Sequence, residues 1–345
     1  MTRDSIHASL VELCGRHSPS GMEQEVDAYL LERLAAMGGE PTVDGAGNII
    51  LRVAGRGDGP PVALLAHKDE IGGLVKRVEE NGRLVAVTLG DAHPWIWGEG
   101  VVEVLGRRDT VTGVLSFGAR HVSEESPQRK QLDKEPVRWR NAWIETKLDS
   151  GTLEAAGVTA GSRVVPARSR KTPVRLGSDG EYIAAHALDN KGSVAALLEL
   201  AELLNAPRCD VDVVFTSREE IGCQGAQWYA RRTDAEALVA VEVVPVAKEY
   251  AIDPGPEPVL VRADASGPLD DGLAGELEDA ATAAGLHMRH CALTRYGSDA
   301  STVLDTGRVA RSACLAFATE NTHGFEIAHL DGIASCVTVL ERWLA

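Results

Sequence analysis

Apolar runs and patterns of helical period alternate along most of the chain. Four apolar runs have the length of strands that are buried on both faces of a sheet, and they cover residues 61–66, 211–216, 237–241 and 312–319. Apolar residues at helical spacing predict helices over 192–204, 271–284 and 332–344. This alternation predicts an α/β domain, with a doubly wound mixed sheet that carries helices on both faces.

A further helix is expected before the first apolar run. Val26, Leu30 and Leu34 recur at helical spacing, and Ser20-Gly21-Met22-Glu23 has the S-x-x-E form of a capping box. We therefore expect the Ser20 side chain to cap this helix.

Residues from about 73 to 171 do not follow the alternating pattern. Leu74–Thr88 alternates around Asn81-Gly82, which is a hairpin signal, and short strands are expected at 101–104 and 111–115. We interpret 73–171 as a small β-barrel-like domain inserted into the α/β domain. The α/β domain then consists of residues 1–72 and 172–345.

Composition and charge narrow the range of functions. The chain of 345 residues has a formal net charge of −16, and its densest basic segment is Arg168-Ser169-Arg170-Lys171, which we expect to be a solvated linker. Nucleic acids and anionic membranes require clustered Lys and Arg, so neither is an expected partner. No apolar stretch approaches the roughly 20 residues of a membrane span, and the first residues lack the apolar core of a signal peptide.

The cysteines point to a cytoplasmic location. All 6 are widely spaced and none forms a C-x-x-C pair. In a chain of this length the spacing favours reduced, buried thiols over a disulfide framework or a cysteine-based metal site.

Candidate catalytic residues lie just after, or at the end of, the predicted strands, although each residue taken alone has an ordinary structural explanation. His67 and Asp69 form a common loop pair, Asp189 could be a helix N-cap, and Glu219-Glu220 could lie in a solvated turn. Glu242 interrupts an apolar run, and a buried carboxylate requires a cation or a proton unless the strand ends there.

Together these positions suggest one site. Strand-like runs are followed or closed by His67, Glu219-Glu220, Glu242 and His323, and Asp189 begins a helix on the same sheet. Ligand sites of open α/β sheets lie outside the carboxyl ends of their strands, so these side chains are expected to converge there. Histidine and carboxylate ligands suit a pair of zinc, cobalt or manganese ions, and a carboxylate such as Asp189 could bridge them.

The same residues carry a resemblance to the glutamyl and deblocking aminopeptidases, a family that includes the large tetrahedral cytosolic aminopeptidases. The similar segments occur in the family's order over nearly the whole chain and read HKDEIGGL, HALDNKGS, SREEIGCQGA, VAVEVV and TENTHGFE. The resemblance implies a zinc-aminopeptidase-like fold. It also implies removal of N-terminal amino acids from peptides by means of a water bridged by two metal ions.

Position by position, the resemblance assigns roles to individual residues. One metal would be held by His67, Asp189 and Glu242, and the second by Asp189, Glu220 and His323. Glu219 would be the general base and Asp69 would support His67. The resemblance also implies a homo-oligomer, up to a dodecamer, in which the inserted domain serves oligomerisation or substrate access.

Three alternatives remain open on the sequence. A metal-dependent deacylase acting on small N-acyl substrates would share every ligand. A glycoside hydrolase would use paired carboxylates without two histidines. The third alternative is a non-catalytic oligomeric binding protein on the same fold.

Overall fold

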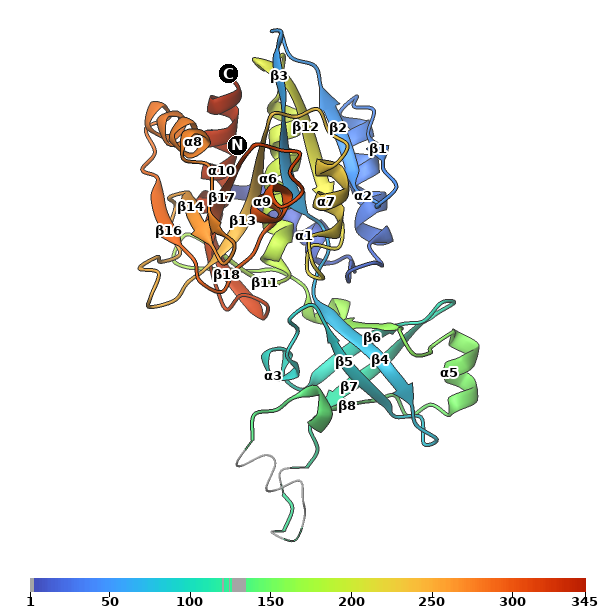
Figure 1. Cartoon of the computed structure of the whole chain (residues 1–345). Coiled ribbons are helices and arrows are strands. Elements are labelled where there is room, and N and C mark those ends of the chain that lie inside the picture. The colour runs from blue at the N-terminus through green and yellow to red at the C-terminus, as the bar shows by residue number, and fades with distance from the viewer. Residues whose placement is uncertain (1–2, 120, 124, 126–134) are drawn as a thin grey trace.

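The computed structural model describes residues 3–119, 121–123, 125 and 135–345, and it divides into an α/β unit and a smaller β-barrel (Figure 1). The α/β unit is built on a 12-stranded mixed sheet. Its main path runs in the order β1 (Thr42–Val43), β2 (Ile49–Val53), β12 (Cys209–Thr216), β3 (Gly59–His67), β13 (Ala237–Pro245), β17 (Arg311–Glu320), β18 (Phe325–His329), β11 (Tyr182–His186) and β10 (Val174–Leu176). Off this path, β14 (Val259–Asp264) pairs with β17, and β15 (Gly267–Pro268) and β16 (Arg289–Ala292) pair with β14.

The centre of the sheet consists of the four predicted apolar runs. β12, β3, β13 and β17 are neighbours, and each adjacent pair is parallel. In β3 the side chains of Leu64 and Ala66 face one core, while those of Ala63 and Leu65 face the other. Burial on both faces explains why these runs lack polar alternation. Because the strands are parallel, their carboxyl ends meet at one edge.

Helices cover both faces of the sheet, as predicted. The described helices of the α/β unit are α1 (Arg3–Cys14), α2 (Gln24–Ala36), α6 (Leu188–Leu203), α7 (Gln224–Ala230), α8 (Asp271–Ala283), α9 (Asp299–Leu304) and α10 (Leu330–Leu344). One core contains residues of α1, α2, α6, α8 and α10, and the opposite core contains residues of α7 and α9.

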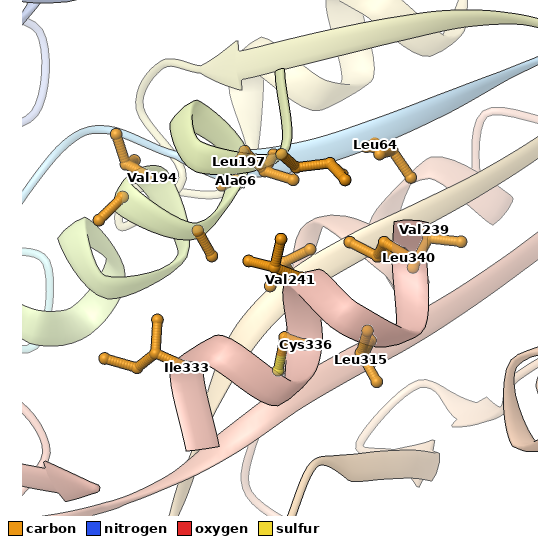
Figure 2. Close-up of a cluster of buried hydrophobic side chains, with 14 of the residues drawn as sticks. Leu64, Ala66, Val194, Leu197, Val239, Val241, Leu315, Ile333, Cys336 and Leu340 are labelled. Atoms are coloured by element: carbon orange, nitrogen blue, oxygen red, sulfur yellow. The ribbon is translucent and has the colours of Figure 1, made fainter. Parts of the chain in front are cut away.

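Figure 2 shows the first of these cores, in which α6 and α10 lie over β3, β13 and β17. Leu197 of α6 and Leu340 of α10 are fully buried, and burial of such a side chain stabilises the fold by about 1.5–3 kcal/mol. A side chain at Gly192 of α6 would come within 2.5 Å of the Phe317 ring on β17. Glycine therefore sets how closely this helix approaches the sheet.

The barrel has a core of its own. Its strands close in the order β4 (Gly72–Val78), β5 (Leu84–Leu89), β8 (Trp143–Glu145), β7 (Thr110–Ser116), β6 (Gly100–Leu105) and β9 (Arg163–Pro166), with α3 (Pro94–Trp97) and α5 (Ser150–Ala156) beside them. The predicted hairpin is present, and Gly82 in its turn has φ +79°. Val104, Leu115 and Trp139 pack inside the barrel.

The segment 168–171 is not the solvated linker that we expected. Arg168–Arg170 forms a short 3-10 helix, and Lys171 is fully buried. Its ammonium group lies against the carboxylate of Glu70, so an internal partner compensates the cost of burying the charge. Charge density along the sequence could not reveal this partner, which lies 101 positions away.

The predicted capping box is also wrong in its detail. Helix α2 begins at Gln24, its N-cap residue is Glu23, and no side chain caps it. The Ser20 hydroxyl instead donates to Oδ2 of Asp69 at 2.6 Å. A tertiary partner has therefore replaced the local one.

Two further expectations concern the whole chain. No helix in the described part of the chain is long and apolar enough to cross a membrane. All six cysteines are free and buried, as expected.

Candidate metal centre

His67 closes the strand β3 and is 2% exposed. Its Nδ1 lies 3.2 Å from the carbonyl oxygen of Asp69, and its Nε2 lies 3.1 Å from Oδ1 of Asp189. When Nδ1 donates its proton to the carbonyl, Nε2 presents a lone pair to a carboxylate oxygen. Two electron-rich atoms this close require a proton or a metal cation between them.

Asp189 lies between two histidines. Its Oδ1 is 3.1 Å from Nε2 of His67, and its Oδ2 is 3.5 Å from Nε2 of His323. The residue follows β11, and its backbone is not helical, with ψ 103°. The N-cap of α6 is Ala187, so the capping role that Asp189 could have had is wrong. A carboxylate placed in this way can bridge two cations.

Glu220 and His323 come from two loops that follow parallel strands. Oε2 of Glu220 lies 3.6 Å from Nε2 of His323, which also faces Asp189. One ligand atom each of His67, Asp189 and Glu220 lie within 4.8 Å of one another. The segments that carry His67, Asp189 and Glu220 thus meet at the edge of the sheet where the sequence analysis expected them.

Glu242 lies inside the central strand β13 and is buried, in accord with the apolar run around it. Its Oε2 accepts a hydrogen bond from Nδ2 of Asn190 at 2.9 Å and lies 3.8 Å from Nε2 of His67. Its Oε1 is buried without a hydrogen-bond partner among the described residues. A buried, half-satisfied carboxylate beside a histidine fits a cation ligand.

Glu219 lies at the border of the same group, with Oε2 3.8 Å from Nε2 of His67. Its other oxygen, Oε1, accepts a hydrogen bond from Sγ of Cys223 at 3.2 Å. The side chains of Glu219 and Glu220 thus contact different neighbours, although they are consecutive in the chain.

Asp69 was expected only to support the His67 ring, but it makes further contacts. Its Oδ1 accepts a hydrogen bond from the backbone N–H of Glu219 at 2.9 Å, and its Oδ2 accepts one from that of Glu220 at 3.3 Å. With the Ser20 hydroxyl as a further donor, the carboxylate is fully buried and multiply bonded. Asp69 therefore fixes the loop that carries both glutamates.

Glu326 holds backbone N–H groups of candidate ligands in the same way as Asp69, and the sequence analysis did not identify it. Its Oε2 accepts from the backbone N–H of Asp189 at 3.0 Å, and its Oε1 accepts from that of His323 at 2.9 Å. The glutamate is buried in β18, three residues after His323. The available signal in the sequence was its place three residues after a candidate ligand, whereas its burial is visible only in the structure.

The electrostatics of this group fit bound cations. Burial raises the pKa of Glu219 to about 8, and burial with the charge of Asp189 raises the pKa of Glu220 well above its usual value. Burial also raises the pKa of Glu242. So many carboxylates cannot all be ionised together in a buried space unless positive charge is added. Oxygen and imidazole donors are those that zinc, cobalt and manganese accept.

A cavity of about 570 Å³ opens onto these residues. Beyond the candidate ligands, its lining includes Ile96, Val243, Arg295 and Tyr296. Cavities of this size hold small molecules or the end of a peptide. Every candidate site residue of the sequence analysis except Asp69 lines this cavity.

Comparisons with known proteins identify relatives of this chain. Residues 47–339 match the family described as M42 glutamyl aminopeptidase. Among curated proteins, the glutamyl aminopeptidase of Lactococcus lactis subsp. cremoris (strain MG1363) is 26% identical over 252 residues, which cover 68% of this chain and 66% of the relative. The chain thus spans about two thirds of the length of the first curated relatives that it matches.

Solved structures share the fold over nearly the whole chain. The TET aminopeptidase of the marine sediment archaeon Thaumarchaeota archaeon SCGC AB-539-E09 is 22% identical with a TM-score of 0.88, over 99% of this chain and 96% of that one. The Pyrococcus horikoshii TET1 peptidase, which can assemble into a tetrahedron or a large octahedral shell, is 23% identical with a TM-score of 0.87, over 98% and 99%.

Proposed function

The chain belongs to the M42 glutamyl aminopeptidase family, and from this membership and the geometry of the centre we propose that it is a metal-dependent aminopeptidase. The observation that carries the proposal is the position of Asp189, one of whose oxygens faces His67 and the other His323. The arrangement suits two divalent ions that share one carboxylate.

The proposed ligands divide into two sets around Asp189. His67 and Glu242 would complete the first set, and Glu220 and His323 the second, with zinc or cobalt as the ions and manganese as a further candidate. Such ions, when bound, polarise a carbonyl group and lower the pKa of a coordinated water. The backbone hydrogen bonds to Asp69 and Glu326 hold the ligand loops in place before any ion binds.

Glu219 is the proposed general base. Its carboxylate lies 3.8 Å from His67 but belongs to neither ligand set, so it can accept a proton from the attacking water. The same carboxyl group would then deliver that proton to the leaving amine. A raised pKa suits both steps, because a general base works best with a pKa near the working pH.

The cavity accounts for exopeptidase action in this proposal. Its volume of about 570 Å³ admits the first residues of a peptide, and its carboxylate-rich floor attracts a protonated amino terminus. The substrate would therefore bind with its amino end against the centre and its chain toward the opening.

We further propose a cytoplasmic homo-oligomer in which residues 73–171 form the inserted domain. The barrel projects away from the α/β unit and is available for contacts between copies (Figure 1). The assembly of the Pyrococcus horikoshii TET1 peptidase, which has the same fold, supports this arrangement. Sedimentation of the purified chain, with and without the barrel residues 73–166 replaced by a short linker that keeps Lys171, tests it.

The activity is tested by metal analysis and a panel of aminoacyl p-nitroanilides. We expect release of nitroaniline that is lost on chelation and restored by Zn²⁺ or Co²⁺. N-acetyl amino acids serve as the alternative substrates in the same assay. Hydrolysis of these alone would assign a deacylase, and activity that survives chelation with no bound metal would refute the proposal.

A further inference from the structure

Glu219 has different neighbours on its two sides. Its Oε2 faces His67 and the proposed ligand sets at 3.8 Å, whereas its Oε1 contacts Sγ of Cys223 at 3.2 Å. The proposed reaction uses only the first side. The second side combines a thiol with a carboxylate and has no part in that reaction.

Asp299 lies on the thiol side. It begins α9 and is fully buried. Its Oδ2 accepts a hydrogen bond from Oγ1 of Thr216 at 2.5 Å, while its Oδ1 has no hydrogen-bond partner among the described residues. An unsatisfied buried carboxylate oxygen costs free energy, so this oxygen can accept a proton or a cation.

Glu219, Cys223 and Asp299 are close enough to share one ion. One carboxylate oxygen of each acid and the Cys223 sulfur lie within 4.8 Å of one another. Ligands of a tetrahedral zinc ion, with Zn–S near 2.3 Å and Zn–O near 2.0–2.2 Å, are separated by about 3.5 Å. The 3.2 Å between Sγ and Oε1 of Glu219 is a few tenths of an ångström shorter than this spacing.

We propose that Glu219, Cys223 and Asp299 form an inhibitory site for a thiophilic divalent cation such as Zn²⁺ or Cd²⁺, distinct from the proposed two-metal centre. The thiol selects such cations over Mg²⁺ and Mn²⁺, which prefer oxygen ligands. On binding, Sγ releases its proton to solvent, and the ion takes Oε1 of Glu219. From the spacing of the cysteines we expected no cysteine-based metal site. The other two ligands proposed here are carboxylates, of which Glu219 lies four residues before Cys223 and Asp299 comes from a distant segment.

The inhibitory effect rests on the proposed role of Glu219, whereas the binding of the ion does not. A carboxylate held by a cation cannot accept a proton from water, so occupancy would stop the reaction without displacing the resident ions. Cys223 lines the same cavity, which gives a free ion access from solvent.

A purely orienting role for Cys223 makes different predictions. The S–H group could serve only as a hydrogen-bond donor that fixes Glu219. The variant Cys223→Ser keeps a donor hydroxyl there but removes the thiolate. An orienting role therefore predicts that the serine variant is as sensitive to added cations as the wild type.

Direct binding is measured on the metal-loaded protein by titration with Cd²⁺. We expect the ultraviolet charge-transfer absorbance of a Cd–thiolate bond, with one additional equivalent bound. The absorbance should vanish in Cys223→Ser, and Asp299→Asn should weaken binding at least about 10-fold, since even the outer partners of metal ligands contribute 10- to 100-fold. Cys209→Ser is the matched control, because Cys209 is buried at the opposite end of β12 and should leave the absorbance unchanged.

Inhibition is measured with Zn²⁺ added to the loaded enzyme, each variant being normalised to its own uninhibited rate. The inhibition midpoint should match the binding constant and rise at least about 10-fold in Cys223→Ser, and Mn²⁺ should not inhibit at the same concentration. Absence of the thiolate absorbance, or equal sensitivity of wild type and Cys223→Ser, would overturn the proposal. A protein that binds the additional Cd²⁺ but hydrolyses no peptide would refute only the proposed function.

Discussion

Glu70 and Lys171 join the two chain segments that pass between the α/β unit and the barrel. The Nζ of Lys171 lies 2.7 Å from Oε1 and 2.8 Å from Oε2 of Glu70, and both side chains are at most 3% exposed. Glu70 precedes β4 and Lys171 follows β9, so one ion pair ties the entry of the barrel to its exit. Lys191 of α6 approaches the same carboxylate at 3.4 Å.

This pair is charged at neutral pH. Burial alone would raise the pKa of Glu70, but the ammonium groups of Lys171 and Lys191 outweigh it and hold the pKa below the usual range. Burial lowers the pKa of Lys171 to about 8, which leaves it mostly protonated at pH 7. The junction is therefore a buried network of charges, and removal of any one of them leaves another buried charge without its partner.

The first prediction concerns the stability of this junction. Glu70→Gln would leave two buried ammonium groups without their carboxylate, and we expect the free energy of unfolding to fall by about 3–5 kcal/mol. Urea denaturation followed by circular dichroism measures the change. Glu79→Gln is the control, since its partner Arg77 is 56% exposed and such pairs contribute at most about 1 kcal/mol. Equal stability of the two variants would show that the junction pair is not structural.

The second prediction is a pH dependence that arises at His17. Its Nδ1 lies 3.1 Å from Nζ of Lys171, and its Nε2 lies 2.5 Å from Oε2 of Glu103. Lysine can only donate, so Nδ1 accepts and Nε2–H donates, which is the neutral tautomer. Burial and the charge of Lys171 lower the pKa of His17 to about 4.

The sign follows from proton binding. Between pH 6.5 and 4 the unfolded chain binds more protons at His17 than the folded chain, so stability falls as the pH drops through this window. At 1.36 kcal/mol per pKa unit the loss is at most about 3.4 kcal/mol. Denaturation of His17→Gln between pH 4 and 7 should give a flatter profile than wild type. A His17→Gln slope equal to that of wild type would contradict the prediction.

The third prediction separates the two consecutive glutamates. Glu219→Gln should keep the bound metal and lose activity by roughly 10²–10⁴-fold, as expected for a lost general base. Glu220→Gln should instead lose bound metal, because its carboxylate faces His323 in the second ligand set. Metal analysis of each variant, together with its rate, distinguishes the roles. Full activity of Glu219→Gln would remove that residue from the mechanism.

The fourth prediction concerns Asp69, which holds the loop of both glutamates. In the wild type, the backbone N–H groups of Glu219 and Glu220 donate to different oxygens of Asp69. The variant Asp69→Asn offers only one oxygen to accept both hydrogen bonds. We expect metal affinity or activity to fall by about 10- to 100-fold, as for other partners of metal ligands. Competition with a chelator of known affinity measures the first effect. Ser20→Ala removes a different donor to the same carboxylate and should have the smaller effect.

Much of the fold was predictable because its centre is simple. Strands such as β3 and β13 are buried on both faces, so their sequences are continuous apolar runs that periodicity identifies directly. The antiparallel strands β11 and β18 were not predicted. They are short, and they contain polar residues such as His186 at the end of β11 and Glu326 within β18. Their identity as strands depends on pairing with each other, which the local sequence does not encode.

The sequence by itself determined which residues could meet. Parallel strands place their carboxyl ends at one edge, and the order of the chain therefore brings His67, Glu220, Glu242 and His323 together. The tertiary structure alone decided how these side chains are held and what else lies beside them. Three sets of contacts depend on the tertiary structure in this way. Asp69 accepts from two backbone N–H groups, Glu70 pairs with Lys171, and Glu219 lies beside Cys223 and Asp299. Each links a buried polar group to a partner whose identity depends on the packing of the whole chain, and no local periodicity carries that information.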